Sequence, residues 1–523
     1  MILTVFIVAL LLAAAVSAQD ESVLAVGISG GMDTLDNAAA SSASAEIILG
    51  QVFDTLVIQQ PLGVYHPGLA TSWTINADAT EYIFELRRDV AFHDGSPFNA
   101  AAVKHSFDRI VDPDSKARTA RSFIGPYAES EVLSEHSIAV RFSSPNAAFL
   151  DALSRPQLAP VSPSALEMLS GDWGVAGLVG TGPFIFETYA PDTEIILVKN
   201  PNYAWGNEDV FGRSGPPSID RLIFKILTDP AERLAALESG EVDMINAVPA
   251  LAAARLEESG GFIVARHDQA GHGHSLIFNQ TKSPTDEFAV RKAIAQAIDI
   301  DIMQDIVYDA SGGKACSALT RSMLGWTDVA CRVNPYDPEA AGALLDQAGW
   351  LMNEETGIRE RDDRPLTIEH WSPDRPLNVV TAYFIAEDMA ALGVDFQINL
   401  ADDPAYLAAL RASDYHTLGS WDAQTDPDGV FRALFHSSKL GASNRSNYRN
   451  VEMDAMIDAA AGLLDPESRA AAYAEIQRKL AEEVVMVYFN DPAVLYARGQ
   501  DLRNVTILNG GLLPNFYSAS IDI

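Results

Sequence analysis

The stretch between residues 69 and 110 restricts the fold more than any other part of the chain. From residue 81 to residue 87, aromatic and aliphatic side chains alternate with more polar ones, which is the period of a strand with one buried face. The tripeptide His93-Asp94-Gly95 has the composition of a tight turn. Asn99 can then cap a helix whose apolar side chains recur at helical spacing. The stretch therefore predicts a strand, a turn and a helix in quick succession.

Further helices are expected where an aspartate precedes a proline. Asp229, Asp337 and Asp465 each offer a side-chain cap, followed by proline at the first helical position and a glutamate near the positive end of the helix dipole. Short apolar strands are expected at residues 195–198, 222–226, 243–245 and 394–398. This alternation along 523 residues predicts mixed α/β layers in about two to four domains.

Several runs of residues follow one another as they do in a known family. They are LATSW at 69–73, YIFELR at 82–87, VAFHDGSPF at 90–98, GTGPF at 180–184, DPAERLAALESGEVD at 229–243 and YDPEAAGALLDQAG at 336–349. In content and order they resemble the extracytoplasmic solute-binding proteins of family 5, which serve ABC importers of the peptide, opine and nickel type. The resemblance extends from about residue 24 to about residue 490.

The resemblance implies an α/β fold of the two-lobed periplasmic binding protein type (Venus-flytrap, type II), with an extra domain inserted in the first lobe. The lobes are joined by two crossover segments. The expected limits are 19–52, 180–272 and 490–523 for the first lobe, 53–179 for the extra domain and 273–489 for the second lobe.

The N-terminus has the pattern of an export signal. Residues 2–16 are almost purely apolar, and Val16-Ser17-Ala18 places small residues where signal peptidase cuts. A retained membrane anchor is the alternative, but the segment lies at the lower end of the roughly 17–25 residues that span a bilayer. No cysteine follows it that could carry a lipid. We therefore expect residues 1–18 to be a cleaved signal peptide and the mature protein to be soluble in the periplasm.

The charge excludes some partners. Lys and Arg number 36 against 71 Asp and Glu, which gives a formal net charge of −35. Such a chain repels phosphate backbones, so nucleic acid is not an expected partner. Solubility is the simplest explanation of the acidity, and a salty habitat or attraction of cationic ligands are the alternatives.

The chain has two cysteines, Cys316 and Cys331. In an oxidising compartment a pair at this spacing is expected to form a disulfide, worth about 3 kcal/mol in the chain-entropy model. A zinc site is a poorer explanation, since no histidine lies beside the two thiols.

The search for catalytic motifs does not indicate an enzyme. We find no nucleophile elbow, no H-E-x-x-H helix and no C-x-x-C, and Gly312-Gly313-Lys314 lacks the spacing of a phosphate-binding loop. The pair His93-Asp94 is better explained by a turn and a cap. His272 and His274 could share one face of a strand and bind a metal, but we expect them to lie on the surface. No catalytic residue, metal or cofactor is therefore expected.

Three segments are candidates for the ligand site, because a two-lobed binder contacts its ligand with loops from both lobes. The first contains Gly31, Met32 and Asp33, directly after the opening strand. Glycine lets the backbone approach a ligand closely. In the resembling family this strand end faces the cleft and can pair with an extended peptide. A plain turn is the alternative.

The second candidate is Trp371-Ser372, between a strand at 366–370 and a helix that starts near Pro376. The free N–H groups at a helix N-terminus suit a carboxylate. Trp371 could form a flat apolar wall of the site or belong to the core.

The third candidate is Trp421-Asp422-Ala423. Members of the resembling family place an aspartate a few residues before a D-P-D-like turn, where it pairs with the α-amine of a bound peptide. Counting back from Asp426, that position is Ala423, and the neighbouring Asp422 points to the other face of a regular strand. A buried amine needs a charged partner. Either Asp422 takes this role after a shift of the backbone, or the ligand is not an ordinary peptide.

The resemblance implies a binding protein that closes on its ligand and delivers it to an inner-membrane ABC permease. Peptides of the di- or oligopeptide class are the expected cargo, and the protein is expected to act as a monomer. Opines, glutathione-like compounds, oligosaccharides and, less readily, nickel are the alternatives within the family. A secreted hydrolase is the alternative outside it.

Overall fold

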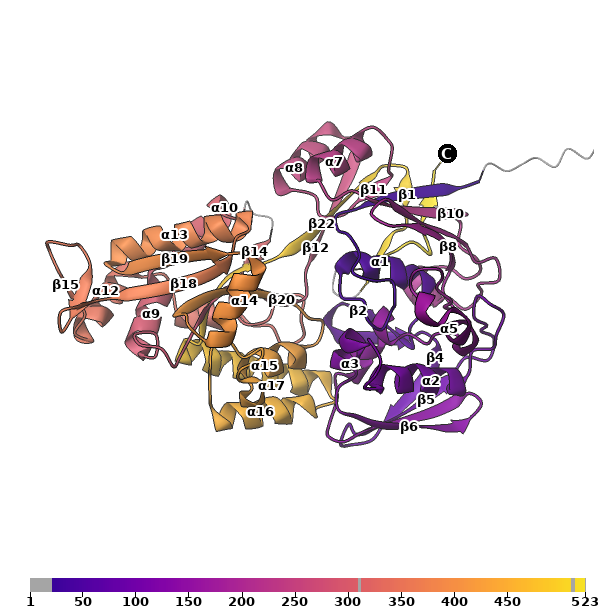
Figure 1. The fold of residues 1–523 in the computed structure, drawn as a ribbon, viewed down its shortest axis with the longest axis horizontal. Coiled ribbons are helices and arrows are strands. Elements are labelled where there is room, and N and C mark those ends of the chain that lie inside the picture. Colours follow the sequence, from indigo (N-terminus) through magenta and orange to yellow (C-terminus); the bar gives the residue numbers. More distant parts are fainter. Residues whose placement is uncertain (1–20, 309–311, 509–512, 523) are drawn as a thin grey trace, which may run out of the picture.

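The computed structural model describes residues 21–308, 312–508 and 513–522, with the exception of the Trp421 side chain. The predicted signal peptide, residues 1–18, lies outside the described residues. Strands and helices form two bodies that lie side by side, one around each of two large sheets (Figure 1). We call the body around the seven-stranded sheet the first lobe and the body around the six-stranded sheet the second lobe.

The first lobe is built on a sheet with the order β12-β22-β11-β1-β10-β9-β8. Its strands are β1 (Val23–Ile28), β8 (Phe184–Ala190), β9 (Glu194–Lys199), β10 (Arg221–Ile226), β11 (Met244–Ile245), β12 (Phe262–Asp268) and β22 (Ala493–Gly499). β1 runs parallel to β10 and β11, and the remaining pairs are antiparallel. The strands predicted at 195–198, 222–226 and 243–245 are confirmed as β9, β10 and β11.

A smaller four-stranded sheet contains the strand that the alternation at residues 81–87 predicts. It has the order β4-β5-β7-β6, with β4 (Ala70–Ile75), β5 (Glu81–Leu86), β6 (Tyr127–Ser134) and β7 (Ser137–Phe142). Tyr82 and Phe84 of β5 are fully buried, and they pack with Phe107 and Phe149 in one aromatic core. Asn99 caps the predicted helix by accepting a hydrogen bond from the Ala102 amide at 3.0 Å.

Helices cover both sheets of the first lobe. They are α1 (Ala43–Val52), α2 (Ala100–Val111), α3 (Arg118–Ile124), α4 (Phe149–Leu153), α5 (Pro163–Leu169), α6 (Glu208–Phe211), α7 (Pro230–Glu238) and α8 (Ala250–Ser259). α1 packs in the large core of the seven-stranded sheet, and α7 and α8 form a separate apolar cluster with β22.

The second lobe is built on a sheet with the order β14-β21-β13-β20-β18-β19. Its strands are β13 (Gly271–Phe278), β14 (Gly313–Lys314), β18 (Thr367–Pro373), β19 (Asp395–Ala401), β20 (Thr417–Ala423) and β21 (Met486–Asp491). A three-stranded sheet of β15 (Leu351–Met352), β16 (Arg359–Arg361) and β17 (Arg364–Pro365) lies at the far end of the lobe (Figure 1).

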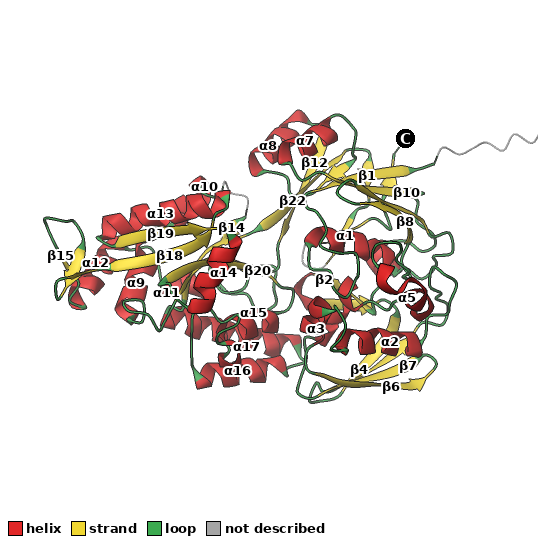
Figure 2. Cartoon of the chain, viewed as in Figure 1, coloured by secondary structure: helices red, strands yellow, loops and turns green. Residues whose placement is uncertain are grey.

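Helices pack on both faces of the six-stranded sheet (Figure 2). They are α9 (Phe288–Ala297), α10 (Ile300–Ile306), α11 (Val329–Val333), α12 (Pro338–Gln347), α13 (Pro376–Leu392), α14 (Asp403–Ala412), α15 (Pro427–Phe435), α16 (Val451–Ala461) and α17 (Pro466–Glu483). Alternate residues of β13 divide between two cores: Leu276 and Phe278 pack with α13, and Ile277 packs in the cluster that includes α14.

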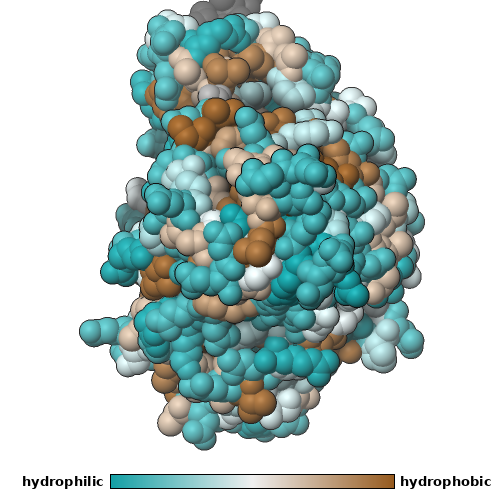
Figure 3. All heavy atoms as spheres, turned by 90° about the vertical axis from the view of Figure 1, so that its left-hand side faces the viewer, coloured by the Kyte–Doolittle hydropathy of each residue, from teal (hydrophilic) through white to brown (hydrophobic). Residues whose placement is uncertain are grey.

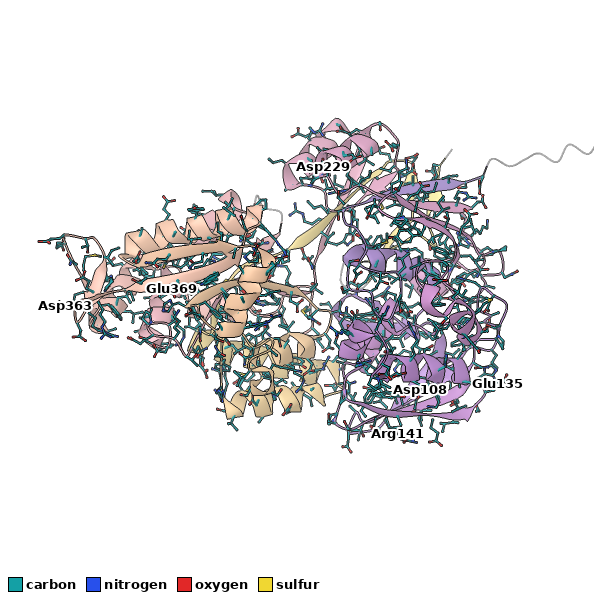
Figure 4. The ribbon with its side chains drawn as sticks, in the orientation of Figure 1. Asp108, Glu135, Arg141, Asp229, Asp363 and Glu369 are labelled. Carbon is teal, nitrogen blue, oxygen red and sulfur yellow. A yellow bond between two sulfur atoms is a disulfide. The ribbon has the colours of Figure 1, made fainter. Side chains whose placement is uncertain are left out.

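The aspartate-proline pairs begin helices as predicted. Asp229 accepts hydrogen bonds from the amides of Ala231 and Glu232 at the start of α7, where Figure 4 labels it. Asp337 and Asp465 cap α12 and α17 in the same way.

The chain crosses between the lobes at two adjacent places. β12 leads into β13 through Gln269 and Ala270, and β21 leads into β22 through Pro492. The two crossings are linked by a hydrogen bond from the Gln269 amide to the Pro492 carbonyl oxygen, 2.9 Å long. Paired strands of this kind form a hinge between two rigid halves. The residue limits given above for the lobes and the extra domain stay a prediction.

A disulfide joins Cys316 to Cys331, with 5.0 Å between their Cα atoms. The predicted pairing is therefore confirmed, and it ties the segment after β14 to α11. No helix within the described ranges is long and apolar enough to cross a membrane. On the face of the second lobe seen end-on in Figure 3, hydrophilic side chains predominate and apolar ones are scattered.

Candidate ligand-binding cleft

Three parallel strands of the second lobe end at the same edge of the sheet. β18 pairs in parallel with β19 on one side and with β20 on the other. α13 connects β18 to β19, and α14 connects β19 back to β20, so the chain reverses direction across β18. The two helices pack in different cores of the sheet. In open α/β sheets the crevice at such a reversal is the usual place for a ligand.

A cavity of about 500 Å³ lies at this crevice. Its polar lining comes from several elements and includes His274 and Ser275 of β13, His370 and Ser372 of β18, Arg375 and Asn378 at the start of α13, Asp403 and Tyr406 of α14, Ser420 of β20, and Arg445 in the loop before α16. This volume falls within the range of about 300–1,000 Å³ that is typical of small-molecule sites.

The cavity lies beside the space between the lobes. Tyr308 of the second lobe lines it and also lines a neighbouring hollow of about 470 Å³. The other walls of that hollow are residues 247–251 and 493–495, which belong to the first lobe. A molecule in the cavity would therefore be close to both halves of the protein.

The third predicted segment lies at the end of β20. Asp422 is opposite His272 and Ala423 is opposite Gly271, so both lie beside the hinge strand β13. The Asp422 side chain is exposed and accepts a hydrogen bond from Gln424 at 3.1 Å, yet burial by surrounding protein raises the pKa of its carboxyl group. A carboxyl group that water reaches but protein surrounds is typical of a cleft. The Trp421 side chain lies outside the described residues.

The second predicted segment lies within a strand. β18 continues through Pro373, so Trp371 and Ser372 lie within the strand, directly before its last residue, and are not part of a loop. Their side chains point to opposite faces, as alternation requires. Ser372 is buried and lines the cavity. Trp371 is half-buried and packs against the core that includes α15 and α17.

The first predicted segment lies in the first lobe, between β1 and α1. Gly31 is exposed, and Met32 packs against the core. The Asp33 carboxylate accepts hydrogen bonds from the Ser41 amide at 2.8 Å and the Ser41 hydroxyl at 2.6 Å. Burial acts to raise the pKa of Asp33, but the hydrogen bonds from Ser41 and Ser42 outweigh it, and the pKa is lowered. In this structure the carboxylate therefore holds the loop before α1.

An arginine that no sequence motif marks bridges the two lobes. The Arg155 guanidinium, from the first lobe, donates a hydrogen bond of 2.6 Å to the Thr425 hydroxyl of the second lobe. Its charge also acts to lower the pKa of Glu46 in the first lobe and of Asp422 in the second, although burial raises both. Arg155 thus lies between the two faces. It belongs to no recognisable motif, so only the tertiary structure reveals it.

The lobes also touch directly on the side away from the hinge. The Ala147 amide donates a hydrogen bond to the Ala461 carbonyl oxygen at 3.0 Å. Nearby, Arg469 of α17 donates two hydrogen bonds of 2.7 Å to Asp426, the residue before α15, and both side chains are almost fully buried. Asp426, predicted to shape the turn, also caps α15 through the Asp428 amide.

The surface position predicted for His272 is wrong. The hinge strand runs between core elements, so the His272 side chain is only 1% exposed. Its ring nitrogens lie 3.0 Å from the Ala318 carbonyl oxygen and 2.7 Å from the Ser275 hydroxyl. Burial lowers the pKa of His272 to about 4, so the ring is neutral at pH 7. Within the described part of the chain, no group of three or more His, Cys, Asp and Glu side chains is arranged to hold a metal ion.

One short pattern matches a catalytic motif in its letters alone. Residues 27–31, Gly-Ile-Ser-Gly-Gly, match the letters G-x-S-x-G of a nucleophile elbow. An elbow is a sharp turn from a strand directly into a helix. Here β1 ends at Ile28 and the next helix begins only at Ala43, while the Ser29 amide donates a hydrogen bond to the Asn246 side chain at 2.8 Å. The match does not form an elbow.

Comparison with known proteins identifies the family. Residues 64–442 match "Bacterial extracellular solute-binding proteins, family 5 Middle". The chain belongs to this family. It is 29% identical over 444 residues to di/tripeptide-binding protein 3 of Pseudomonas aeruginosa (strain UCBPP-PA14), covering 80% of this chain and 79% of the relative. It is 25% identical over 467 residues to the nickel-binding periplasmic protein of Escherichia coli (strain K12), covering 87% and 86%.

A solved structure has the same fold. The structure of HbpA2 from Haemophilus parasuis superposes with a TM-score of 0.82 over 96% of this chain and 100% of that one, at 22% sequence identity. The two-lobed type II fold predicted from the motifs is therefore confirmed. This family 5 protein is a substrate-binding protein of the ABC importer class, a group of binding proteins rather than enzymes.

Proposed function

We propose that this family 5 protein captures short peptides between its lobes in the periplasm and delivers them to an inner-membrane ABC permease. The observation that carries the proposal is the position of Asp422. It lies at the edge of the interlobe space, it is accessible to solvent, and its pKa is raised by partial burial. A peptide α-amine would give this carboxylate the cationic partner that a desolvated charge needs.

The positions along β20 suit a short ligand. Two residues of strand separate Ser420, which lines the cavity, from Asp422, a distance of about 7 Å. An extended dipeptide spans a similar distance, about 7 Å. The di/tripeptide-binding relative from Pseudomonas aeruginosa supports the same class of ligand.

Transport follows from closure about the paired hinge strands. A ligand shifts the lobes toward the closed form only if it binds that form better, so it must contact both lobes. Asp422 lies on the second lobe, and Arg155, Glu46 and Asp33 lie on the facing part of the first. ATP is hydrolysed by a separate subunit, and the mature protein acts as a monomer after cleavage of residues 1–18, with no lipid anchor.

A non-peptide solute is the second candidate. Ala423 occupies the position where the family's amine-binding aspartate is expected, and this favours a ligand such as an opine or a glutathione-like compound. Unfolding freshly purified protein and identifying the released small molecule by mass spectrometry separates the two candidates.

Isothermal titration with dipeptides and tripeptides tests the peptide proposal directly. Asp422→Ala is expected to lower affinity at least tenfold, while Asp414→Ala, at an exposed position in the turn before the same strand, is expected to leave it unchanged. Equal affinity in wild-type protein and Asp422→Ala would exclude Asp422 from the site.

A further inference from the structure

We propose that Thr425 and Arg155 form a latch that holds the two lobes together through contacts made by the protein alone. The second lobe supplies the Thr425 hydroxyl, and the first lobe supplies the Arg155 guanidinium, which donates a hydrogen bond to it at 2.6 Å. The inference goes beyond the proposed function, because it concerns the balance between the open and closed forms whatever the cargo is.

The latch lies away from the hinge. The chain crosses between the lobes at β12 and β22, whereas Thr425 lies just before α15, which Figure 1 shows beside α3 of the first lobe. A second direct contact between the lobes lies nearby, where the Ala147 amide donates a hydrogen bond to the Ala461 carbonyl oxygen at 3.0 Å. The lobes are therefore joined at two separate places, and opening at the hinge must break the latch.

The first lobe fixes its half of the latch. The Arg155 guanidinium lies over the Phe123 ring, 4.3 Å from its centroid, and the Arg155 Nε is 3.6 Å from the Asp151 carboxylate. The Asp151 carboxylate in turn accepts a hydrogen bond from Gln59 at 2.8 Å. The Arg155 and Asp151 side chains are each 8% exposed. These contacts hold the guanidinium in the direction of the second lobe.

The second lobe fixes the other half. Thr425 is half-buried between the end of β20 and the start of α15. The next residue, Asp426, caps α15 and accepts two hydrogen bonds of 2.7 Å from Arg469 of α17. Thr425 is thereby attached to two helices of its lobe, and it moves away from Arg155 only when the whole lobe moves.

The facing charges of the two lobes also act on each other. Burial raises the pKa of Asp151, and the charge of Arg155 acts to lower it. From the second lobe, the charge of Asp426 acts to raise the same pKa, and hydrogen bonding by Thr425 acts to lower it. Thr425 thus interacts with both members of the first-lobe pair.

Loss of the Thr425 hydroxyl would penalise the closed form alone. A buried donor that loses its acceptor costs free energy, and a charged donor costs more than a neutral one. When the lobes are apart, water can accept the hydrogen bond from Arg155 in place of the hydroxyl, so the open form loses little. The latch therefore changes the ratio of open to closed protein.

Hydrogen exchange in the cargo-free mature protein tests the latch without a ligand. The hydrogen bond between Ala147 and Ala461 protects the Ala147 amide while the lobes touch. The neighbouring Asn146 amide donates its hydrogen bond to Ala79 of the same lobe at 2.9 Å and is the internal control. Mass spectrometry with electron-transfer fragmentation measures the exchange of the two amides separately.

Three variants isolate the contribution of the hydroxyl. Thr425→Val replaces it with a methyl group of similar size, and Thr425→Ser retains it. Thr74→Val makes the same exchange at an exposed position of β4 in the first lobe and is the matched control. Circular dichroism checks that each variant is folded.

We expect the Ala147 amide to exchange about tenfold faster, or more, in Thr425→Val, which is the effect of losing one hydrogen bond to a charged group. Thr425→Ser and Thr74→Val should remain close to wild type, and Asn146 should exchange at the same rate in all the proteins. Arg155→Lys keeps a positive charge beside Asp151 but removes the Nη2 donor. It should also accelerate Ala147, and it decides the question if Thr425→Val does not fold.

Equal exchange of Ala147 in wild type and in Thr425→Val would overturn the latch. So would an Ala147 amide that is unprotected in wild type, or one that Thr425→Ser accelerates as much as Thr425→Val does. An equal acceleration of Ala147 and Asn146 would also refute it, because that result means local unfolding and not separation of the lobes. Since no ligand is present, these outcomes do not depend on whether peptides are the cargo.

Discussion

Two regions of the second lobe contain poorly exposed arginines, and they treat them in opposite ways. Where the lobes touch, Arg469 is held by Asp426 through two hydrogen bonds of 2.7 Å, and both side chains are almost fully buried. In the cavity, Arg445 is half-buried and contacts no carboxylate among the described residues. The contrast indicates that an arginine that stabilises the fold has its carboxylate partner within the protein. Arg445 has no such partner among the described residues.

The largest expected effect comes from breaking the complete pair. Arg469→Ala leaves the Asp426 carboxylate buried without its cation, which typically costs about 3–5 kcal/mol of unfolding free energy. Urea denaturation measures the change. Arg478→Ala, which removes an arginine of the same helix whose side chain is 41% accessible, is the control and should leave the midpoint nearly unchanged. A loss from Arg469→Ala no larger than that of the control would show that the pair does not stabilise the fold.

A second buried carboxyl group, at the hinge, should make the stability of the fold depend on pH. Asp491 is 1% exposed, and its Oδ1 has no hydrogen-bond partner among the described residues. Burial raises the pKa of Asp491 to about 7, although the nearby charge of Arg321 lowers it. Because the folded-state pKa exceeds that of the unfolded chain, about 3.9, the folded protein binds the extra proton. Its contribution to stability is present below pH 4 and is lost as the pH rises toward 7.

Asp491→Asn should remove that part of the pH dependence. Relative to wild type, the variant is expected to gain on the order of 4 kcal/mol in unfolding free energy between pH 4 and pH 8. Urea denaturation across this range measures the difference, and Asp114→Asn, in an exposed turn, is the control. Parallel pH curves for wild type and Asp491→Asn would exclude a raised pKa at the hinge.

The raised pKa of Asp422 predicts a smaller effect, which concerns ligand binding and not folding. An amine-binding carboxylate must be ionised, and burial raises the pKa of Asp422. Peptide affinity should therefore weaken on acidification at a higher pH than an ordinary aspartate, with a pKa of about 3.9, would produce. Titrations with a peptide that has no acidic side chain, from pH 7 down to pH 4, test this. In Asp422→Asn the remaining affinity should no longer follow the same pH profile.

The smallest effect should be the cost of removing Arg445. Since its guanidinium has no partner among the described residues, Arg445→Gln is expected to change the unfolding free energy of the ligand-free protein by less than about 0.5 kcal/mol. A large loss of stability in Arg445→Gln would mean that this arginine supports the fold as Arg469 does.

Local chemistry explains what could be predicted from the sequence. The caps at Asp229, Asp337 and Asp465 satisfy backbone amides two or three residues away, so the sequence pattern contains the whole interaction. The alternation that places Tyr82 and Phe84 in a core is equally local. The cysteines lie 15 residues apart, close enough for pairing to be expected, and the disulfide is confirmed.

Contacts between distant segments explain what was missed. Arg155 and Thr425 are 270 residues apart, and no motif surrounds either one. The prediction that His272 lies on the surface was wrong because Ala318, in a distant loop, and Ser275, in the same strand, enclose the ring. Arg445, His370 and Arg375 come from a loop, a strand and a helix start, which only the reversal of the chain across β18 brings to one cavity.

The order of motifs along the sequence revealed the resemblance to the family, and that resemblance implied the two-lobed class. Hydrophobic period and helix caps determined single strands and helices, because these depend on short-range contacts. The tertiary structure alone decided which charges are paired and which face an open cavity. That distinction depends on how far each side chain is removed from water and what lies opposite it, and both are set by segments that are remote in the chain.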